Sequence, residues 1–303
     1  MKKNAFIFPG QGTQAIGMGA DLAHDFPVAK DVFDEVDETL HQNLSRLMFE
    51  GDIQELTQTQ NAQPAVMAVS MAIFRVLMAE GVQKPEAVAG HSLGEYSALC
   101  AAGVLDLSQT AKLLQMRGAA MARACQQSEG GMLALLGATF EQANELVNNC
   151  GCYVANDNAP GQIVLSGNLK TLEAVKDQAQ KMGIKRIVPL AVSGAFHSPL
   201  MKKAADEMTP VLVSTSFNKP QIPVYFNVSA ETESNPSLYA KLLAEQITAP
   251  VRWRELIQNM KMTSFVECGP GTVLSGLVRR ILPQSETQNI NTSKSLTSYL
   301  KEI

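Results

Sequence analysis

The pentapeptide Gly90-His91-Ser92-Leu93-Gly94 constrains the fold of this chain more than any other feature. It joins a short apolar run, residues 86–90, to a helical pattern from about 93 to 102. Glycines on both sides permit the tight strand-to-helix turn in which a serine is exposed as a nucleophile. A glycine-rich turn that has arisen by chance is the alternative, but the flanking strand and helix favour a nucleophile at Ser92.

Strands and helices alternate through much of the remaining sequence. Further predicted strands cover residues 4–8, 222–228 and 263–267, and predicted helices cover 27–40, 43–49, 64–80, 108–125, 237–247, 251–261 and 272–282. Another helix is expected to begin at Ser198-Pro199, with Ser198 as the N-cap and Pro199 in the first helical position. Alternation of this kind predicts an α/β fold with a mostly parallel sheet.

The middle of the chain follows a different order. Strands are predicted at 131–137, 151–155, 162–166 and 184–190, and helices at 139–149 and 169–182. The resulting order, β-α-β-β-α-β, is typical of the ferredoxin-like pattern. We therefore expect a small inserted subdomain at residues 127–191, within a larger α/β domain formed by residues 1–126 and 192–303.

Composition excludes several classes of protein. The chain has 303 residues, of which 46% are hydrophobic and 18% charged, an ordinary balance for a globular protein. Lys and Arg number 25 against 29 Asp and Glu, so bulk positive charge does not favour nucleic-acid binding. The five cysteines contain no Cys-x-x-Cys pair, which favours free thiols in a reducing compartment over a metal site or a disulfide framework.

The sequence gives no indication of a membrane partner. The apolar run that follows Lys2 and Lys3 stops at Pro9, short of the roughly 7–15 apolar residues of a signal peptide. The longest apolar helix candidate, Ala65–Met78, is shorter than the about 20 residues that span a bilayer. We therefore expect a cytoplasmic protein.

A serine nucleophile needs a base, and the chain offers four histidines. His24 and His41 lie in an acidic helical stretch and are expected at the surface. His91 adjoins Ser92 in the turn and should point away from it. His197 lies downstream of the serine, the order that hydrolase-like sites use. It also precedes a predicted helix start, whose positive end would help to keep the imidazole neutral.

A third catalytic group is harder to assign. The acids between Ser92 and His197 in the sequence include Asp106, Asp157 and Asp177, and none of them ends a predicted core strand. We therefore expect that a carbonyl or amide orients His197, which leaves a Ser-His dyad.

Two further features bear on the reaction. Arg117 lies on a largely apolar segment before Gly118, where it could bind a carboxylate in a two-pronged pair, although a structural arginine is the simpler interpretation. The Leu93 backbone N–H is a natural donor to an oxyanion.

The segment from Gly10 to Ala15 fits the dinucleotide pattern G-x-G-x-x-A, but Pro9 precedes it and no acid at a strand end follows at the required distance. An NAD-dependent oxidoreductase is therefore disfavoured. A backbone N–H of Gln11 that faces the site is the better use of this loop.

Taken together, these stretches resemble the malonyl-CoA:acyl carrier protein transacylases, the acyltransferases of fatty acid synthesis and polyketide assembly. The resemblance spans the chain, and its motifs occur in order. They are Phe8-Pro9-Gly10-Gln11-Gly12, Gly90-His91-Ser92-Leu93-Gly94-Glu95, Gln115-Met116-Arg117-Gly118, Asn156-Asp157-Asn158-Ala159-Pro160-Gly161-Gln162, Ser193-Gly194-Ala195-Phe196-His197-Ser198-Pro199, Gln246-Ile247-Thr248-Ala249-Pro250-Val251 and Glu267-Cys268-Gly269-Pro270-Gly271. The family fold is a hydrolase-like core with a ferredoxin-like insert.

The resemblance implies a role for each matching residue. Ser92 would be the acylated nucleophile and His197 its base, with the Gln11 and Leu93 N–H groups as the oxyanion hole. The remaining roles concern substrate binding and orientation: Arg117 would hold the malonyl carboxylate, the Gln246 carbonyl would orient His197, Phe196 would fill the space of an α-methyl group, and Asn158 would lie on the insert side of the cleft.

The resemblance also implies the substrates and partners. Malonyl-CoA would acylate Ser92, and the phosphopantetheine thiol of acyl carrier protein would accept the malonyl group, with no cofactor or metal. From residue 170 onward there are 16 Lys and Arg against 11 Asp and Glu, which fits an acidic carrier. A serine thioesterase or hydrolase and an acyltransferase of a polyketide pathway remain alternatives. We expect a monomer.

Overall fold

The computed structural model describes residues 3–127, 129–192 and 194–302. Its larger part is built on a five-stranded sheet, sheet A, in the order β7-β2-β1-β8-β9, and every neighbouring pair is parallel. The strands are β1 (Asn4–Phe8), β2 (Ala87–Gly90), β7 (Val224–Tyr225), β8 (Ser264–Cys268) and β9 (Glu286–Ile290).

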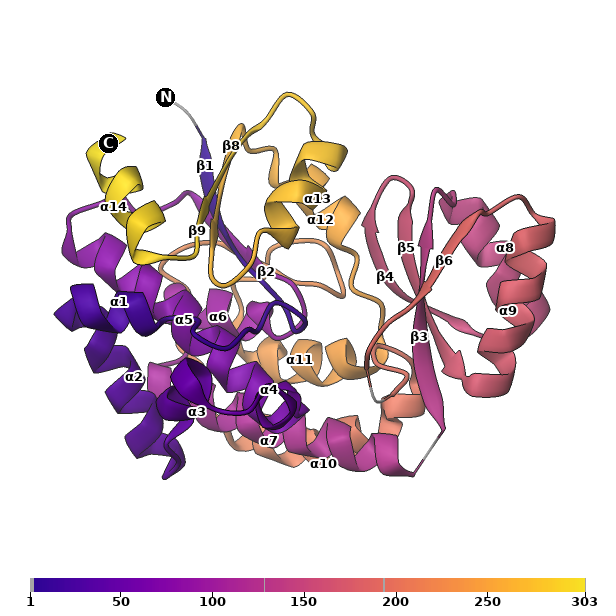
Figure 1. The fold of residues 1–303 in the computed structure, drawn as a ribbon, viewed down its shortest axis with the longest axis horizontal. Helices are drawn as coiled ribbons and strands as arrows, with labels where there is room; N and C mark the ends of the chain where they lie inside the picture. The colour runs from indigo at the N-terminus through magenta and orange to yellow at the C-terminus, as the bar shows by residue number, and fades with distance from the viewer. Residues whose placement is uncertain (1–2, 128, 193, 303) are drawn as a thin grey trace.

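Helices pack on both faces of sheet A (Figure 1). They are α1 (Ala20–Asp25), α2 (Pro27–Leu40), α3 (Leu44–Glu50), α4 (Ile53–Thr57), α5 (Thr59–Ala79), α6 (Gly94–Ala101), α7 (Leu107–Gln126), α10 (Lys202–Ser214), α11 (Tyr239–Thr248), α12 (Trp253–Met260), α13 (Val273–Ile281) and α14 (Ser293–Glu302), with short 3-10 turns at Pro199–Met201 and Pro236–Leu238.

The period of two along β1 explains this arrangement, because successive strand residues face opposite sides of a sheet. Phe6 and Phe8 join the core cluster that contains α5 and α7. Ala5 and Ile7 join a second cluster on the other face, with α12 and α13.

Helix α5 is longer than the sequence predicts. It runs for 21 residues, which by length and apolar composition alone would be enough to cross a membrane. However, 83% of its most apolar window is buried inside the protein. Its hydrophobicity is therefore accounted for by packing in the core.

The insert forms a separate antiparallel sheet, sheet B, in the order β4-β5-β3-β6. It consists of β3 (Gly130–Leu136), α8 (Phe140–Cys150), β4 (Tyr153–Ala159), β5 (Gln162–Asn168), α9 (Leu169–Lys181) and β6 (Arg186–Pro189). Both helices lie on the side of sheet B that faces away from sheet A (Figure 1). The predicted α/β class with a parallel sheet and a ferredoxin-like insert is confirmed.

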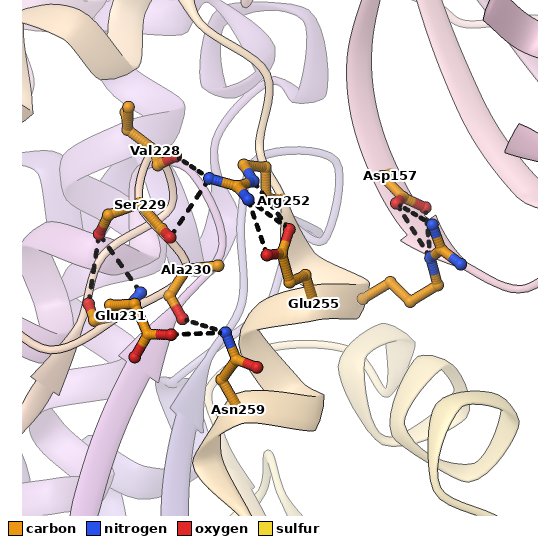
Figure 2. Close-up of polar contacts among 9 residues, drawn as sticks. Asp157, Val228, Ser229, Ala230, Glu231, Arg252, Glu255 and Asn259 are labelled. Carbon is orange, nitrogen blue, oxygen red and sulfur yellow. Dashed lines mark hydrogen bonds and ion pairs between the residues drawn. The ribbon is translucent and has the colours of Figure 1, made fainter.

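Strand β4 attaches the insert to the larger part. The Asp157 N–H donates to the Val251 carbonyl at 3.0 Å, and the Val251 N–H donates to the Ala155 carbonyl at 2.9 Å. The Asp157 carboxylate also forms a two-pronged ion pair with the Arg254 guanidinium, whose Nη2 and Nε donate to it at 2.7 and 2.9 Å (Figure 2). These contacts join β4 to the start of α12.

Two local predictions were wrong, and the last strand and helix were not predicted. Residues 222–228 do not form one long strand: β7 is limited to Val224–Tyr225, because the chain then turns so that Asn227 can bind the nucleophile turn. Ser198 does not cap a helix. Its hydroxyl donates to the Ala195 carbonyl at 2.6 Å, and Pro199 opens a 3-10 turn before α10. The final strand and helix, β9 and α14, were not predicted. Four of the five residues of β9 are polar, because the strand lies at the edge of sheet A, so it lacks the apolar pattern of a buried strand.

Candidate active site

Ser92 lies on a sharp turn between β2 and α6, with a backbone φ of 55°. Glycine is required on both sides of it by close backbone approach. A Cβ on Gly90 would lie 1.8 Å from the Gly94 carbonyl oxygen, and a Cβ on Gly94 would lie 2.2 Å from the Phe8 carbonyl oxygen. The G-x-S-x-G pattern therefore reflects backbone contacts between β1, β2 and α6.

His197 contacts the serine directly. Its Nε2 lies 2.8 Å from the Ser92 Oγ, and its Nδ1 lies 2.9 Å from the backbone carbonyl of Gln246. A carbonyl can only accept a hydrogen bond, so Nδ1 carries the proton and Nε2 accepts the proton of the serine hydroxyl. This is the tautomer that a general base requires.

The imidazole of His197 is held neutral. Its pKa is lowered from 6.5 to about 3, chiefly by burial and also by the positive charge of Arg117. Its neutrality was predicted from the positive end of a following helix, but the dominant cause is burial, and the segment that follows His197 begins with a short 3-10 turn.

Arg117, on α7, is 1% exposed and lies next to the nucleophile. Its Nη2 donates to the Ser92 Oγ at 3.1 Å and to the Gln246 Oε1 at 2.8 Å, and its Nη1 donates to the Gln63 Oε1 at 2.8 Å. Its Nε is buried without a hydrogen-bond partner in the described part of the chain. A buried guanidinium beside the nucleophile creates a strong preference for an anionic group.

Two further side chains of α6 surround the guanidinium. Tyr96 places its ring 5.7 Å from the Arg117 Cζ. Glu95 is fully buried, and burial raises its pKa to about 8, although the Asn227 backbone N–H and the charge of Arg117 oppose the shift. At pH 7 the Glu95 carboxyl is thus mostly protonated, so it does not neutralise Arg117.

A cavity of about 240 Å³ opens beside these groups, and its walls come from strands of sheet B and from loops and helices of the larger part. Five of the predicted site residues besides Ser92 line it: Gln11, Arg117, Asn158, Phe196 and His197. The Asn158 Oδ1 lies 2.9 Å from the His91 Nε2, which ties the insert wall to the nucleophile turn.

Gln246, on α11, and Leu93, at the start of α6, do not line the cavity. Gln246 is buried and contacts three partners: its carbonyl accepts from His197, its Oε1 from Arg117, and its Nε2 donates to the Ser92 carbonyl at 3.0 Å. The Leu93 side chain is fully buried, so only its backbone N–H can take part in the predicted oxyanion hole.

The other histidines and acids lie where the sequence places them or have structural partners. His24 and His41 are exposed, and His91 packs against Trp253 with ring centroids 5.5 Å apart. Asp106 caps α7, Asp157 pairs with Arg254, and Asp177 is exposed on α9. None of these acids contacts His197, whose Nδ1 is instead hydrogen-bonded to the Gln246 backbone carbonyl.

Sequence reasoning missed Gln63 and Asn227, and it did not weigh Glu95. The sequence contains a weak indication for two of them. Gln63 is a polar residue in the otherwise apolar run of α5, and Glu95 is an acid one turn after the nucleophile. Burial is what makes these signals meaningful, and it becomes visible only in the folded chain.

Among the residues that the structure describes, no group of three His, Cys, Asp or Glu side chains could hold a metal ion.

The fold and the site define a serine enzyme of the hydrolase-like α/β type. Residues 5–302 match the family described as acyl transferase domain, and the chain belongs to this acyltransferase family. Malonyl CoA-acyl carrier protein transacylase of Bacillus subtilis (strain 168) is 44% identical, over 100% of this chain and 98% of that protein.

Solved structures agree with this assignment. An acyl carrier protein S-malonyltransferase from Vibrio cholerae is 40% identical, with a TM-score of 0.95 over 98% of this chain and 99% of that one. A malonyl-transacylase described in complex with a type II PKS acyl-carrier protein is 38% identical, with a TM-score of 0.96 over 99% and 100% of the two chains. The predicted resemblance to malonyl-CoA:acyl carrier protein transacylases is confirmed.

Gly94→Ala is expected to lower the free energy of unfolding by about 3 kcal/mol, because the added methyl group cannot avoid the Phe8 carbonyl. Gly276→Ala is the matched control: it lies within α13 with no atom within 4 Å of the new Cβ, so it should gain up to about 1 kcal/mol. Urea unfolding followed by circular dichroism measures both. A Gly94→Ala variant as stable as the parent would contradict the steric account of the turn.

The rate at which phenylmethanesulfonyl fluoride inactivates the enzyme through Ser92 should stay nearly constant as the pH is lowered from 7.5 to 5. With a folded-state pKa of about 3, His197 remains a neutral base over this whole range. A histidine with the ordinary pKa would lose roughly thirtyfold in its basic form at pH 5. A fall in rate centred near pH 6.5 would show that burial does not control this residue.

Proposed function

We propose that this protein transfers the malonyl group from malonyl-CoA to the phosphopantetheine thiol of acyl carrier protein, through a malonyl ester on Ser92. The observation that carries the proposal is the distance of 3.1 Å between the Arg117 Nη2 and the Ser92 Oγ. A buried cation at this distance is suited to an acyl group that ends in a carboxylate, as malonyl does.

In the first half-reaction, the Ser92 Oγ attacks the thioester carbonyl carbon of malonyl-CoA while its proton passes to the His197 Nε2. The negative charge that develops on the carbonyl oxygen would be bound by the backbone N–H groups of Gln11 and Leu93. Collapse of the tetrahedral intermediate breaks the carbon–sulfur bond. The His197 imidazolium returns the proton to the sulfur, and coenzyme A leaves as the thiol.

The second half-reaction repeats these steps with a different nucleophile. The pantetheine thiol gives its proton to the neutral His197, and its sulfur attacks the malonyl ester. The Ser92 oxygen leaves and regains the proton from His197. Transfer thus follows a ping-pong order in which each half-reaction uses the same base and the same oxyanion site.

The remaining residues set selectivity. Arg117 would bind the free carboxylate, held in orientation by Gln63 and Gln246. Phe196 is buried next to His197 in the cavity wall and would occupy the space that an α-methyl group needs. Asn158 would contribute to the insert side of the cleft.

The transfer would supply malonyl-loaded carrier protein for fatty acid synthesis and needs no cofactor beyond its substrates. We infer a monomeric, cytoplasmic enzyme in which residues 127–191 form the smaller subdomain and residues 1–126 and 192–303 the larger one. A serine thioesterase is the main alternative, but the anion site formed by Arg117 has no evident use in plain ester hydrolysis. A carrier of polyketide synthesis is the second alternative.

The carrier protein would approach over the basic residues near the cavity mouth. Arg280 is exposed on α13, whose first turns line the cavity, and its Nη1 donates to the Gln162 Oε1 of the insert at 2.7 Å. Arg279, Lys185 and Arg186 are exposed as well. Lys202 is less suitable, because its charge is paired with Asp206, whereas the exposed Lys203 contacts the neutral Gln127.

Intact-protein mass spectrometry after brief mixing with malonyl-CoA tests the proposal. The enzyme should gain one malonyl group, Ser92→Ala should gain none, and pantetheinylated carrier protein should discharge the adduct. Release of coenzyme A with no adduct and no loaded carrier would identify a thioesterase instead.

Arg117→Ala should lower kcat/KM for malonyl-CoA by about 10²-fold, because each hydrogen bond to a charged group contributes about 1.5–3 kcal/mol. Relative use of acetyl-CoA should rise. Arg123→Ala on the same helix is the matched control, since that arginine is exposed and pairs with Glu207. Unchanged selectivity between malonyl and acetyl donors in Arg117→Ala would refute the carboxylate role.

Charge reversal at Arg280, as Arg280→Glu, should raise KM for the acidic carrier protein several-fold and reduce its salt dependence, while transfer to free pantetheine stays the same. Arg46→Glu, on the acidic N-terminal side, serves as the control. An equal loss with carrier and with free pantetheine would place the defect in the cavity rather than in docking.

A further inference from the structure

We propose that Asn227 is a positioning residue of the acyl-transfer site, which fixes the backbone of the nucleophile turn and restricts the oxyanion to donors other than the Ser92 N–H. The inference rests on the proposed function, since it concerns the rate at which Ser92 is acylated. Asn227 is far from Ser92 in the sequence and lies just after β7, the edge strand of sheet A.

The side-chain amide of Asn227 makes two hydrogen bonds to the turn. Its Oδ1 accepts from the Ser92 backbone N–H at 2.8 Å, and its Nδ2 donates to the Gly90 carbonyl at 2.7 Å. One planar group therefore sets the separation of two backbone groups that flank His91. The residue is completely buried, so water does not compete for these bonds.

These two hydrogen bonds stabilise the strained backbone of the nucleophile turn. A non-glycine residue with a positive φ costs roughly 1–2 kcal/mol and persists where its surroundings fix it. Ser92 has a φ of 55°, and both of its backbone groups are engaged: Asn227 binds the N–H, and the Gln246 Nε2 donates to the carbonyl at 3.0 Å. These partners fix the backbone of Ser92, and the hydroxyl that it carries contacts His197 and Arg117.

The same contact has a consequence for the oxyanion. A backbone N–H has one proton to donate, and the proton of Ser92 is directed at the Asn227 Oδ1. It is therefore withheld from the reacting carbonyl. The donors left to stabilise the tetrahedral intermediate are those of Gln11 and Leu93, from two different elements of the chain.

Asn227 is itself held from several sides. Its N–H donates to the Glu95 Oε2 at 2.5 Å, and its carbonyl accepts from the Arg252 N–H at 3.1 Å. Figure 2 shows the contacts that hold the loop after Asn227. The Arg252 guanidinium donates to the Val228 and Ser229 carbonyls and also forms an ion pair with Glu255. The Asn259 side-chain amide donates to the Ala230 carbonyl and to the Glu231 carboxylate. Residues at the start of and within helix α12 therefore hold Asn227 and the loop that follows it in place.

Rapid-quench measurement of Ser92 malonylation by intact mass tests the proposal, because it separates the number of competent sites from the rate per site. Asn227→Ala should reach nearly the same final amplitude as the parent, with a rate per site lower by about 10²-fold. KM for malonyl-CoA should change little, because the Arg117 contacts are not touched. A purely structural residue would lower the amplitude and leave the rate per site unchanged.

Asn259→Ala is the matched control. It removes an asparagine of the same network that makes two hydrogen bonds, but it does not contact the nucleophile turn. It should acylate at the parent rate per site even where its unfolding temperature is lower.

A second variant, Asn227→Asp, keeps the shape of the side chain. A protonated aspartic acid can donate to the Gly90 carbonyl and accept from the Ser92 N–H, whereas the ionised form cannot donate. Burial favours the protonated form, which should prevail at pH 5.5, so ionisation is expected only at alkaline pH. Glu95 contacts this residue and has a pKa of about 8, so each rate is compared with that of the parent enzyme at the same pH. Relative to the parent, acylation by Asn227→Asp should be nearly unchanged at pH 5.5 and should slow at pH 9.

Three results would decide against the role. One is a rate per site for Asn227→Ala within threefold of the parent. Another is a loss of amplitude that alone accounts for its lower activity. If Asn227→Ala does not fold, the third is an Asn227→Asp rate, relative to the parent, that is the same at pH 5.5 and at pH 9. Absence of malonylation in the parent enzyme would instead refute the proposed function, so the two failures are distinguishable.

Discussion

The contact between the Phe8 carbonyl and Gly94 determines much of the rest of the site. Strand β1 and helix α6 approach so closely there that only a hydrogen atom fits on Gly94, and the same carbonyl accepts the His91 N–H at 3.0 Å. This close approach places the loop after β1 next to the loop after β2. The proposed oxyanion donors, the backbone N–H groups of Gln11 and Leu93, come from these two loops.

A second constraint is the burial of charge and of potential charge around Ser92. Arg117, Glu95 and His197 share one low-dielectric environment, and each responds differently. The arginine stays charged, supported by amide oxygens, while burial keeps the acid and the histidine mostly neutral at pH 7. One net positive charge beside a neutral base is the electrostatic arrangement suited to an anionic acyl group, because the base can still take a proton while the cation binds the carboxylate.

The sequence predicted those parts of the fold that are determined by residues close together in the chain. The glycines of the nucleophile turn, the apolar strands and the β-α-β-β-α-β order depend on neighbouring residues, and the fold class followed from them. The roles assigned to Asn158 and Phe196 came from resemblance, and the structure adds that both line one cavity with Ser92. Asn227 was not foreseen, because its importance comes from contacts with residues more than a hundred positions away. Strand β9 was missed because a polar edge strand lacks apolar alternation.

The support of Arg117 by amide side chains limits how acyl preference can change by mutation. Gln63 and Gln246 come from α5 and α11, and both aim an oxygen at the guanidinium. Replacing the arginine with an apolar residue would leave these two oxygens buried without a donor, at about 1–3 kcal/mol each. Libraries that seek an enzyme for neutral acyl groups should therefore vary all three positions together. Such a specificity change is improbable along a path of single substitutions that each preserve stability.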